Sequence, residues 1–126
     1  MSTIRTATLA NLAGTDSPDI AGGELARARF NLNGAGTIAA RDSFNVSSYV
    51  DNGLGDYSSN WAVAFPNANY TVNSNAAAGS ETPTSSVRAL IATSVVVGSV
   101  RNIGIIQTNS ATDYTYCFVT VFGDKP

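Results

Sequence analysis

The feature that most constrains this chain is an alternation of apolar and polar residues with a period of two. Residues 57–65 read YSSNWAVAF, which places four large side chains on one side of an extended backbone: Tyr57, Trp61, Val63 and Phe65. Successive side chains of a β-strand point to opposite faces, so this spacing predicts a half-buried strand. We expect Trp61 and Phe65 to lie in the core.

A second segment, residues 114–122 (YTYCFVTVF), has apolar residues on both faces. Tyr114, Tyr116, Phe118 and Phe122 share one face, and Cys117, Val119 and Val121 share the other. The pattern predicts a strand that is central in its sheet or contacts another subunit, with Phe118 and Phe122 in the core. Cys117 is the one cysteine, so no intrachain disulfide forms, and we expect it to be a small buried apolar side chain.

The remaining pattern also indicates strands. Residues 87–97 and 100–107 fit two long strands, with Gly104 at a bulge or a close backbone approach. Shorter candidates are 26–32, 36–40, 43–49 and 69–73. Residues 21–30, AGGELARARF, have some helical propensity but run into NLNGAG, so we expect mostly strand there.

Many short strands separated by turn residues predict an all-β fold, an antiparallel, jelly-roll-like β-sandwich. Its 126 residues fit one domain. Residues 10–24 are weak in pattern, and with the residues before them they suggest an extended N-terminal arm. We expect an N-terminal arm at 1–24, a sandwich domain at 25–126, and a long exposed loop at 74–86.

Composition excludes several functions. The absence of histidine removes Ser-His-Asp and Cys-His catalysis. Charged residues make up 13% of the chain, and its seven basic residues are scattered, so we expect no nucleic-acid partner. No apolar run reaches the length of a membrane span, and the N-terminus does not read as a signal peptide. A polar, uncharged surface is common in secreted and virion proteins and in subunits of assemblies.

The acidic segment DNGLGD, residues 51–56, has two interpretations. Calcium binds oxygen ligands in glycine-rich loops, which makes Asp51, Asn52 and Asp56 candidate ligands. The alternative is a hairpin turn in which Asn52-Gly53 supplies a positive φ and the Asp51 side chain caps the turn. We favour the turn, because two carboxylates are few for calcium, and we expect no cofactor. Residues 31–37, NLNGAGT, likewise favour a tight turn over a phosphate loop.

Two further functions would involve sugars: hydrolysis of a glycosidic bond and binding of a glycan. Asp42 and Asp113 could form a carboxylate pair of the glycosidase type, but no motif supports it. Exposed aromatic rings can stack on sugars. Candidate glycan or receptor contacts are Tyr49 beside the acidic loop and three residues of the 74–86 loop: Ser80, Glu81 and Thr82.

Residues 26–72 hold a series of short motifs in a fixed order. They are Asn33-Gly34-Ala35-Gly36-Thr37, Arg41-Asp42-Ser43, Asn45-Val46-Ser47-Ser48, Asp51 to Tyr57, and Pro66-Asn67-Ala68-Asn69-Tyr70. Through these motifs the segment resembles a module of tailed-bacteriophage virion proteins, usually described as tail-fibre or minor structural proteins. The resemblance covers just over a third of the chain, and its opening, RFNLNGAG, departs from the family's aromatic-rich start.

The resemblance implies a non-catalytic structural protein on the exterior of a virion. It implies a homotrimer, because fibre and spike subunits are usually three-fold, with residues 1–24 attached to other virion proteins and the β domain facing outward. We therefore expect a small tail-fibre or spike subunit involved in host attachment through surface glycan. A capsid decoration protein is the first alternative, and a glycan-degrading enzyme is the second.

Overall fold

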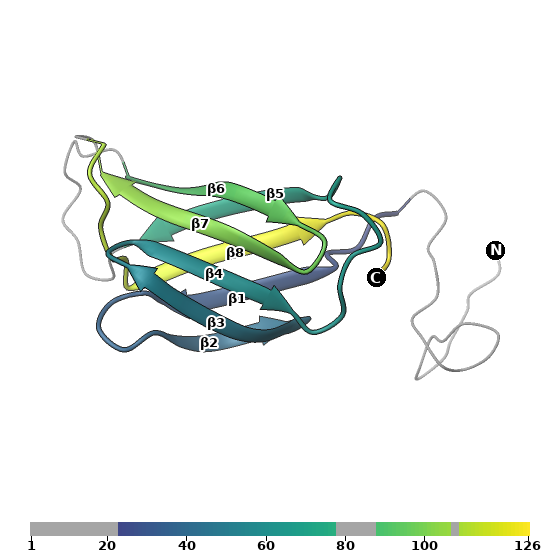
Figure 1. Ribbon diagram of the computed structural model, residues 1–126, viewed down its shortest axis with the longest axis horizontal. Coiled ribbons are helices and arrows are strands. Elements are labelled where there is room, and N and C mark those ends of the chain that lie inside the picture. Colours follow the sequence, from purple (N-terminus) through teal and green to yellow (C-terminus); the bar gives the residue numbers. More distant parts are fainter. Residues whose placement is uncertain (1–22, 78–87, 107–108) are drawn as a thin grey trace, which may run out of the picture.

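The structure, a computed structural model, describes residues 23–77, 88–106 and 109–126. These residues form strands and no helix (Figure 1). The prediction of an all-β sandwich is confirmed. Residues 23–30 contain no helix, but the strand expected over most of 21–30 begins only at Ala28. The strands are β1 (Ala28–Asn33), β2 (Ala39–Phe44), β3 (Val46–Gly53), β4 (Asp56–Trp61), β5 (Thr71–Ala77), β6 (Arg88–Val96), β7 (Ser99–Ile106) and β8 (Tyr116–Phe122).

Two four-stranded antiparallel sheets pack face to face. Sheet A has the order β2-β1-β8-β5, and sheet B has the order β3-β4-β7-β6. The prediction that residues 114–122 hold a central strand is confirmed, since β8 pairs with β1 on one side and β5 on the other. The alternative explanation of its two apolar faces, a contact with another subunit, stays untested.

The core lies between the sheets, where inward-facing residues alternate with outward-facing ones. Sheet A contributes mainly aliphatic side chains and one thiol, whereas sheet B contributes aromatic and polar groups. The buried residues of β1 and β8 are Ala28, Phe30, Leu32, Cys117, Val119 and Val121, and those of β4 and β7 include Tyr57, Ser59, Trp61, Val100 and Asn102. Trp61 and Phe65 are buried as expected.

Phe118 corrects the expected packing of β8. It is 41% exposed, and the expectation that it belongs to the core is wrong. The strand turns its smaller side chains, including Cys117 and Val119, between the sheets, so the aromatic ring on the alternate position faces outward. Phe122 lies on the same outer face and is half-buried rather than core.

Val63 also departs from the prediction, which placed it on the same face of one strand as Trp61 and Phe65. Strand β4 ends at Trp61, two residues before Val63. Its backbone N–H donates to Asn45 Oδ1 (2.7 Å), and its carbonyl accepts from Asn45 Nδ2 (3.1 Å). The backbone has therefore left the ladder, and the Val63 side chain is 56% exposed. Phe65 returns to the core, and its N–H donates to the carbonyl of Val97 (2.8 Å).

Asn45 explains why two strand boundaries differ from expectation. It has a φ of 56° and separates β2 in sheet A from β3 in sheet B. Asparagine tolerates this left-handed conformation better than most residues. Strands expected at 36–40 and 43–49 therefore become β2 and β3, which meet at this residue.

Two further boundaries differ. The strand expected at 69–73 is β5, so residues 74–77 continue a strand rather than open the predicted loop. The rest of that loop, 78–86, and most of the expected N-terminal arm, 1–22, lie outside the described residues. Gly104 is a close backbone approach and not a bulge: an added Cβ would lie 2.8 Å from both the Thr112 carbonyl and the Tyr114 ring.

Candidate functional site

The acidic segment 51–56 forms the turn of the β3–β4 hairpin. Leu54 and Gly55 form the turn itself, with positive φ at Gly53 (129°) and Gly55 (66°). The Asp51 carboxylate accepts a hydrogen bond from the backbone N–H of Gly53 (3.0 Å). The hairpin interpretation, with its positive φ at Gly53 and its Asp51 cap, is confirmed.

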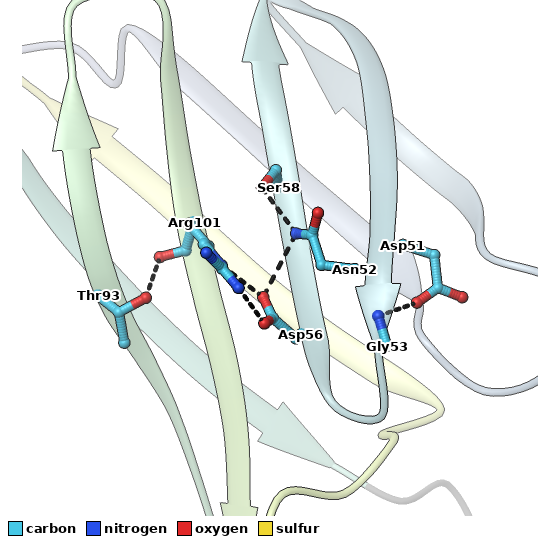
Figure 2. A network of polar contacts seen from close by, with 7 residues as sticks. All are labelled: Asp51, Asn52, Gly53, Asp56, Ser58, Thr93 and Arg101. Atoms are coloured by element: carbon cyan, nitrogen blue, oxygen red, sulfur yellow. Dashed lines mark hydrogen bonds and ion pairs between the residues drawn. The ribbon is translucent and has the colours of Figure 1, made fainter.

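Asp56 joins this hairpin to β7 (Figure 2). Its two carboxylate oxygens accept from Arg101 Nε (2.8 Å) and Nη2 (2.5 Å), a bidentate pair. Asn52 Nδ2 donates to the same carboxylate (3.3 Å) and to Ser58 Oγ (2.8 Å). The hydrogen bonds from Arg101 hold the pKa of Asp56 below its usual value, so the carboxylate is kept ionised.

This geometry bears on the calcium candidates. In Figure 2 the side chain of Asp51 points away from Asp56, toward the other side of the hairpin. Asp56 is occupied by the Arg101 guanidinium, so coordination there requires breaking an ion pair. Within residues 23–77, 88–106 and 109–126, no three acidic, histidine or cysteine side chains cluster as metal ligands. Calcium binding by Asp51, Asn52 and Asp56, the interpretation that the sequence disfavours, stays untested.

Asp113 fixes the turns at one end of the sandwich. Its carboxylate accepts from the backbone N–H of Gly55 (2.6 Å) and from the Tyr57 hydroxyl (2.9 Å). The Tyr57 oxygen also lies 2.9 Å from the carbonyl of Gly34. Burial, and then the neighbouring Asp113 carboxylate, raise the pKa of Tyr57 far above its usual value. The tight turn predicted at 31–37 is confirmed, with Gly36 at a φ of 68°.

Asp42 and Asp113, the carboxylates considered as a glycosidase pair, bind different groups. Asp42 forms an exposed ion pair with Arg29 (2.5 Å), whereas Asp113 binds the turn groups described above. Cys117 is buried as expected, and burial raises the pKa of its thiol to about 11. These three groups therefore serve the fold in this structure.

Of the four predicted glycan contacts, the structure describes one, Tyr49. Tyr49 is half-buried and faces inward, with its ring edge-on to Phe30 (centroids 5.4 Å apart, 76° between planes). Ser80, Glu81 and Thr82 lie outside the described residues. Four other aromatic rings are buried: Tyr57, Trp61, Tyr70 and Tyr114.

Tyr116 is different, because it lies on the outer face of sheet A. Its ring stacks with that of Phe118 (centroids 5.9 Å apart, 15° between planes). The guanidinium of Arg41 lies over the Tyr116 ring, 4.1 Å from its centroid, and donates a hydrogen bond to the carbonyl of Thr115 (2.6 Å). Beside Phe118 lies an open hollow of about 290 Å³, lined by Asn73, Asn75 and Thr120 among others.

We call the residues Asn73, Asn75, Tyr116, Phe118 and Thr120 the aromatic–amide surface. The sequence interpretation missed it because it assigned Phe118 to the core and residues 74–77 to a loop. The available signal was the period-two spacing of Asn73 and Asn75, which continues the strand pattern to Ala77.

Sheet B has a different outer surface. Ile91 of β6 is 44% exposed and pairs in register with Ile103 of β7, and Ile105 lies two residues further along the same face of β7. We call these three residues the isoleucine patch. A second hollow, of about 380 Å³ and mainly apolar, lies where β1 begins and the chain ends after β8, lined in part by Leu25, Phe44, Val63 and Pro126.

Comparison with known proteins adds no relative. The chain matches no family model, no curated protein and no solved structure. In the described part of the chain, no helix has the length and apolar character needed to cross a membrane.

Proposed function

We propose that this chain is a structural subunit of a tailed-bacteriophage particle, a small tail-fibre or spike subunit that forms a homotrimer and attaches to the host surface. The resemblance of residues 26–72 to phage virion modules motivates the proposal. The observation that carries it is that apolar side chains face outward on both sheets, with Phe118 41% and Ile91 44% exposed. A subunit that assembles and binds uses such surfaces.

The isoleucine patch is the contact between copies in this proposal. Ile91, Ile103 and Ile105 present branched aliphatic carbon and no side-chain hydrogen-bonding group, so they gain only by leaving water. They lie on the edge strand β6 and its neighbour β7. A three-fold axis beside β6 would bring three copies of the patch together, because a closed symmetric assembly buries the same surface of every subunit.

The ends of the sandwich fit an attached subunit. Arg27, just before β1, donates its backbone N–H to Val121 near the end of β8 (2.8 Å), so the chain enters and leaves the sandwich at one end. The β3–β4 turn lies at the opposite end (Figure 1). In the proposed particle, the first end faces the other virion proteins and the second end faces outward.

Antibody labelling of particles tests the proposal. Gold-labelled antibody against the purified chain is applied to intact tailed-phage particles that encode it, and the particles are viewed by electron microscopy. We expect label on tail fibres or spikes. Label spread over the head would support the alternative, a capsid decoration protein, and particles without label would overturn the virion assignment.

The enzyme alternative has a separate test. Purified chain is incubated with host surface polysaccharide, and reducing ends are measured with time. We expect no increase over buffer. Release of reducing ends that is lost in Asp113→Asn, with the fold retained, would replace the structural proposal with a hydrolase.

A further inference from the structure

The aromatic–amide surface has a regular construction across sheet A. Phe118 of β8 lies opposite Asn31 of β1 on one side and Asn75 of β5 on the other. One step along the strands, Thr120 lies between Arg29 and Asn73. Neighbouring strands lie about 4.8 Å apart, so amide side chains stand on both sides of the Phe118 ring at roughly that spacing.

The polar groups beside Phe118 are available to a ligand. Within the described part of the chain, the Asn73 amide and the Thr120 hydroxyl take part in no hydrogen bond. Asn75 uses only its Oδ1, which accepts from the N–H of Ala76 (2.8 Å), and its amide N–H groups remain for other acceptors. Together with the exposed ring they line the hollow of about 290 Å³.

The chemistry of this hollow selects a neutral, hydroxyl-rich ligand. Neither β5 nor β8 carries a charged residue. The charged residues of the neighbouring strands are engaged: Arg29 pairs with Asp42, and Arg41 lies over the Tyr116 ring and donates to the Thr115 carbonyl. A sugar ring has apolar C–H faces that pack on an aromatic ring, and hydroxyls at its edge that bond to amides and hydroxyls. A second protein copy would bury the amides of Asn73 and Asn75, and each would then need a hydrogen-bond partner from that copy.

We propose that the aromatic–amide surface is a binding site for a neutral oligosaccharide. A sugar ring packs on Phe118, Tyr116 supports that ring from the same strand, and Asn73, Asn75 and Thr120 bond to hydroxyls. This rests on the proposed function for its biological setting, in which the ligand is a glycan of the host surface. A single shallow site binds weakly, and the three copies of a trimer strengthen attachment by avidity.

Binding of defined oligosaccharides to the full chain tests the site. The neutral probes are four hexasaccharides, built of glucose, of mannose, of galactose and of N-acetylglucosamine. The acidic probe is a hexasaccharide of hexuronic acid. Saturation-transfer NMR identifies binders, and calorimetry measures their affinity. We expect at least one neutral probe to bind, and Phe118→Ala to weaken its affinity by at least about tenfold, because the stacking contact is lost.

Two matched variants make the result specific. Phe118→Tyr keeps the ring and should retain binding. Phe44→Ala removes another exposed phenylalanine of sheet A, which is 55% exposed on the edge strand β2 and lines the other hollow. Phe44→Ala should leave affinity unchanged. Melting temperatures of all variants establish that each one folds.

Several results would overturn the site: no neutral probe binding to the wild type, stronger binding of the acidic probe, or equal affinity in Phe118→Ala and wild type. The assay uses purified chain and no particle. If no sugar binds, the oligosaccharide site is overturned, but the proposed virion role still depends on the labelling of particles. If particles carry no label, the virion role is overturned, but a measured sugar affinity still supports the site.

Discussion

The two sheets of this sandwich distribute their chemistry in opposite ways. Sheet A is mainly aliphatic inside along β1 and β8, and carries aromatic, amide and hydroxyl groups outside along β8 and β5. Sheet B places Tyr57, Ser59 and Asn102 inside, and carries the isoleucine patch outside on β6 and β7, beside the Arg101–Asp56 ion pair. The same period-two alternation therefore produces two outer surfaces of different character.

The difference indicates different partners for the two surfaces. An aliphatic patch without donors or acceptors is stabilised mainly by excluding water, which suits a complementary protein surface. A ring flanked by unpaired amides suits a ligand that offers both C–H faces and hydroxyls. The proposed division gives assembly to sheet B and sugar recognition to sheet A. The following predictions test that division and the inner layers of the two sheets.

The largest expected effect is the loss of assembly in Ile91→Asp. A carboxylate in the isoleucine patch would be buried without a partner between copies, which costs several kcal/mol. Light scattering on a sizing column should show the molar mass falling threefold relative to the wild type.

Val50→Asp is the matched control for that variant. Val50 is 45% exposed, against 44% for Ile91, and it lies on β3, the other edge strand of sheet B. Its mass should equal that of the wild type. Equal masses for Ile91→Asp and wild type, both trimeric, would remove the isoleucine patch from the contact.

The inner face of sheet B supplies the next prediction. Tyr57→Phe removes a buried hydroxyl that contacts Asp113 and the Gly34 carbonyl, so we expect unfolding free energy to fall by about 1–3 kcal/mol. Urea denaturation measures it. Tyr116→Phe, on the outer face of sheet A, should change stability by less than about 0.5 kcal/mol. Equal losses in both variants would contradict the anchoring role of Tyr57.

A smaller effect concerns the outer face of sheet B in acid. Arg101 lowers the folded pKa of Asp56, so this pair stabilises the fold above the unfolded pKa and the contribution is lost as pH falls through the folded pKa. Thermal melts of wild type and Asp56→Asn should therefore differ at neutral pH and converge between about pH 5 and pH 2. A difference that stays constant with pH would show that Arg101 does not hold an ionised Asp56.

The smallest effect is expected inside sheet B at Ser59. Its side chain is fully buried, and its hydroxyl has no hydrogen-bond partner among the described residues. Ser59→Ala should leave the free energy of unfolding unchanged or raise it by up to about 1 kcal/mol.

Ser74→Ala provides the comparison. Ser74 of β5 donates to Asn102 Oδ1 across the two sheets (3.1 Å), and its loss should cost about 0.5–1.5 kcal/mol. If Ser59→Ala destabilises the chain as much as Ser74→Ala, then the Ser59 hydroxyl has a partner in solution.

Period two predicted the sandwich because each strand must place one face on the core. Trp61 and Phe65 were expected inside and are buried. The acidic turn also followed from local chemistry, since glycine at positive φ and an aspartate cap need no distant contact. These features depend on a few neighbouring residues, which is why the sequence indicates them.

Alternation alone did not decide which face of β8 is the inner one. Both faces are apolar, and the choice depends on how much volume sheet B leaves between the layers once Tyr57 and Trp61 occupy it. The small face of Cys117, Val119 and Val121 fits that space, and Phe118 is turned outward. Since the aromatic–amide surface arises from that choice, it was not predictable from a single strand.

The change of sheet at Asn45 was missed for a related reason. Its side chain bonds to Val63, 18 residues away, and to the carbonyl of Arg27. A left-handed asparagine is a local signal, but its meaning as the crossing between sheets depends on those distant partners. The sequence pattern therefore indicates a break at residues 41–42, whereas the chain changes sheet at Asn45.

The most direct test of the division between the two outer surfaces is the molar mass of Phe118→Ala in solution, measured by light scattering beside the wild type. We predict three times the chain mass for both, because in the proposed division sheet A binds sugar and sheet B forms the contact between copies. A trimeric wild type with a monomeric Phe118→Ala would place the subunit contact on sheet A, and a monomeric wild type would contradict self-assembly altogether.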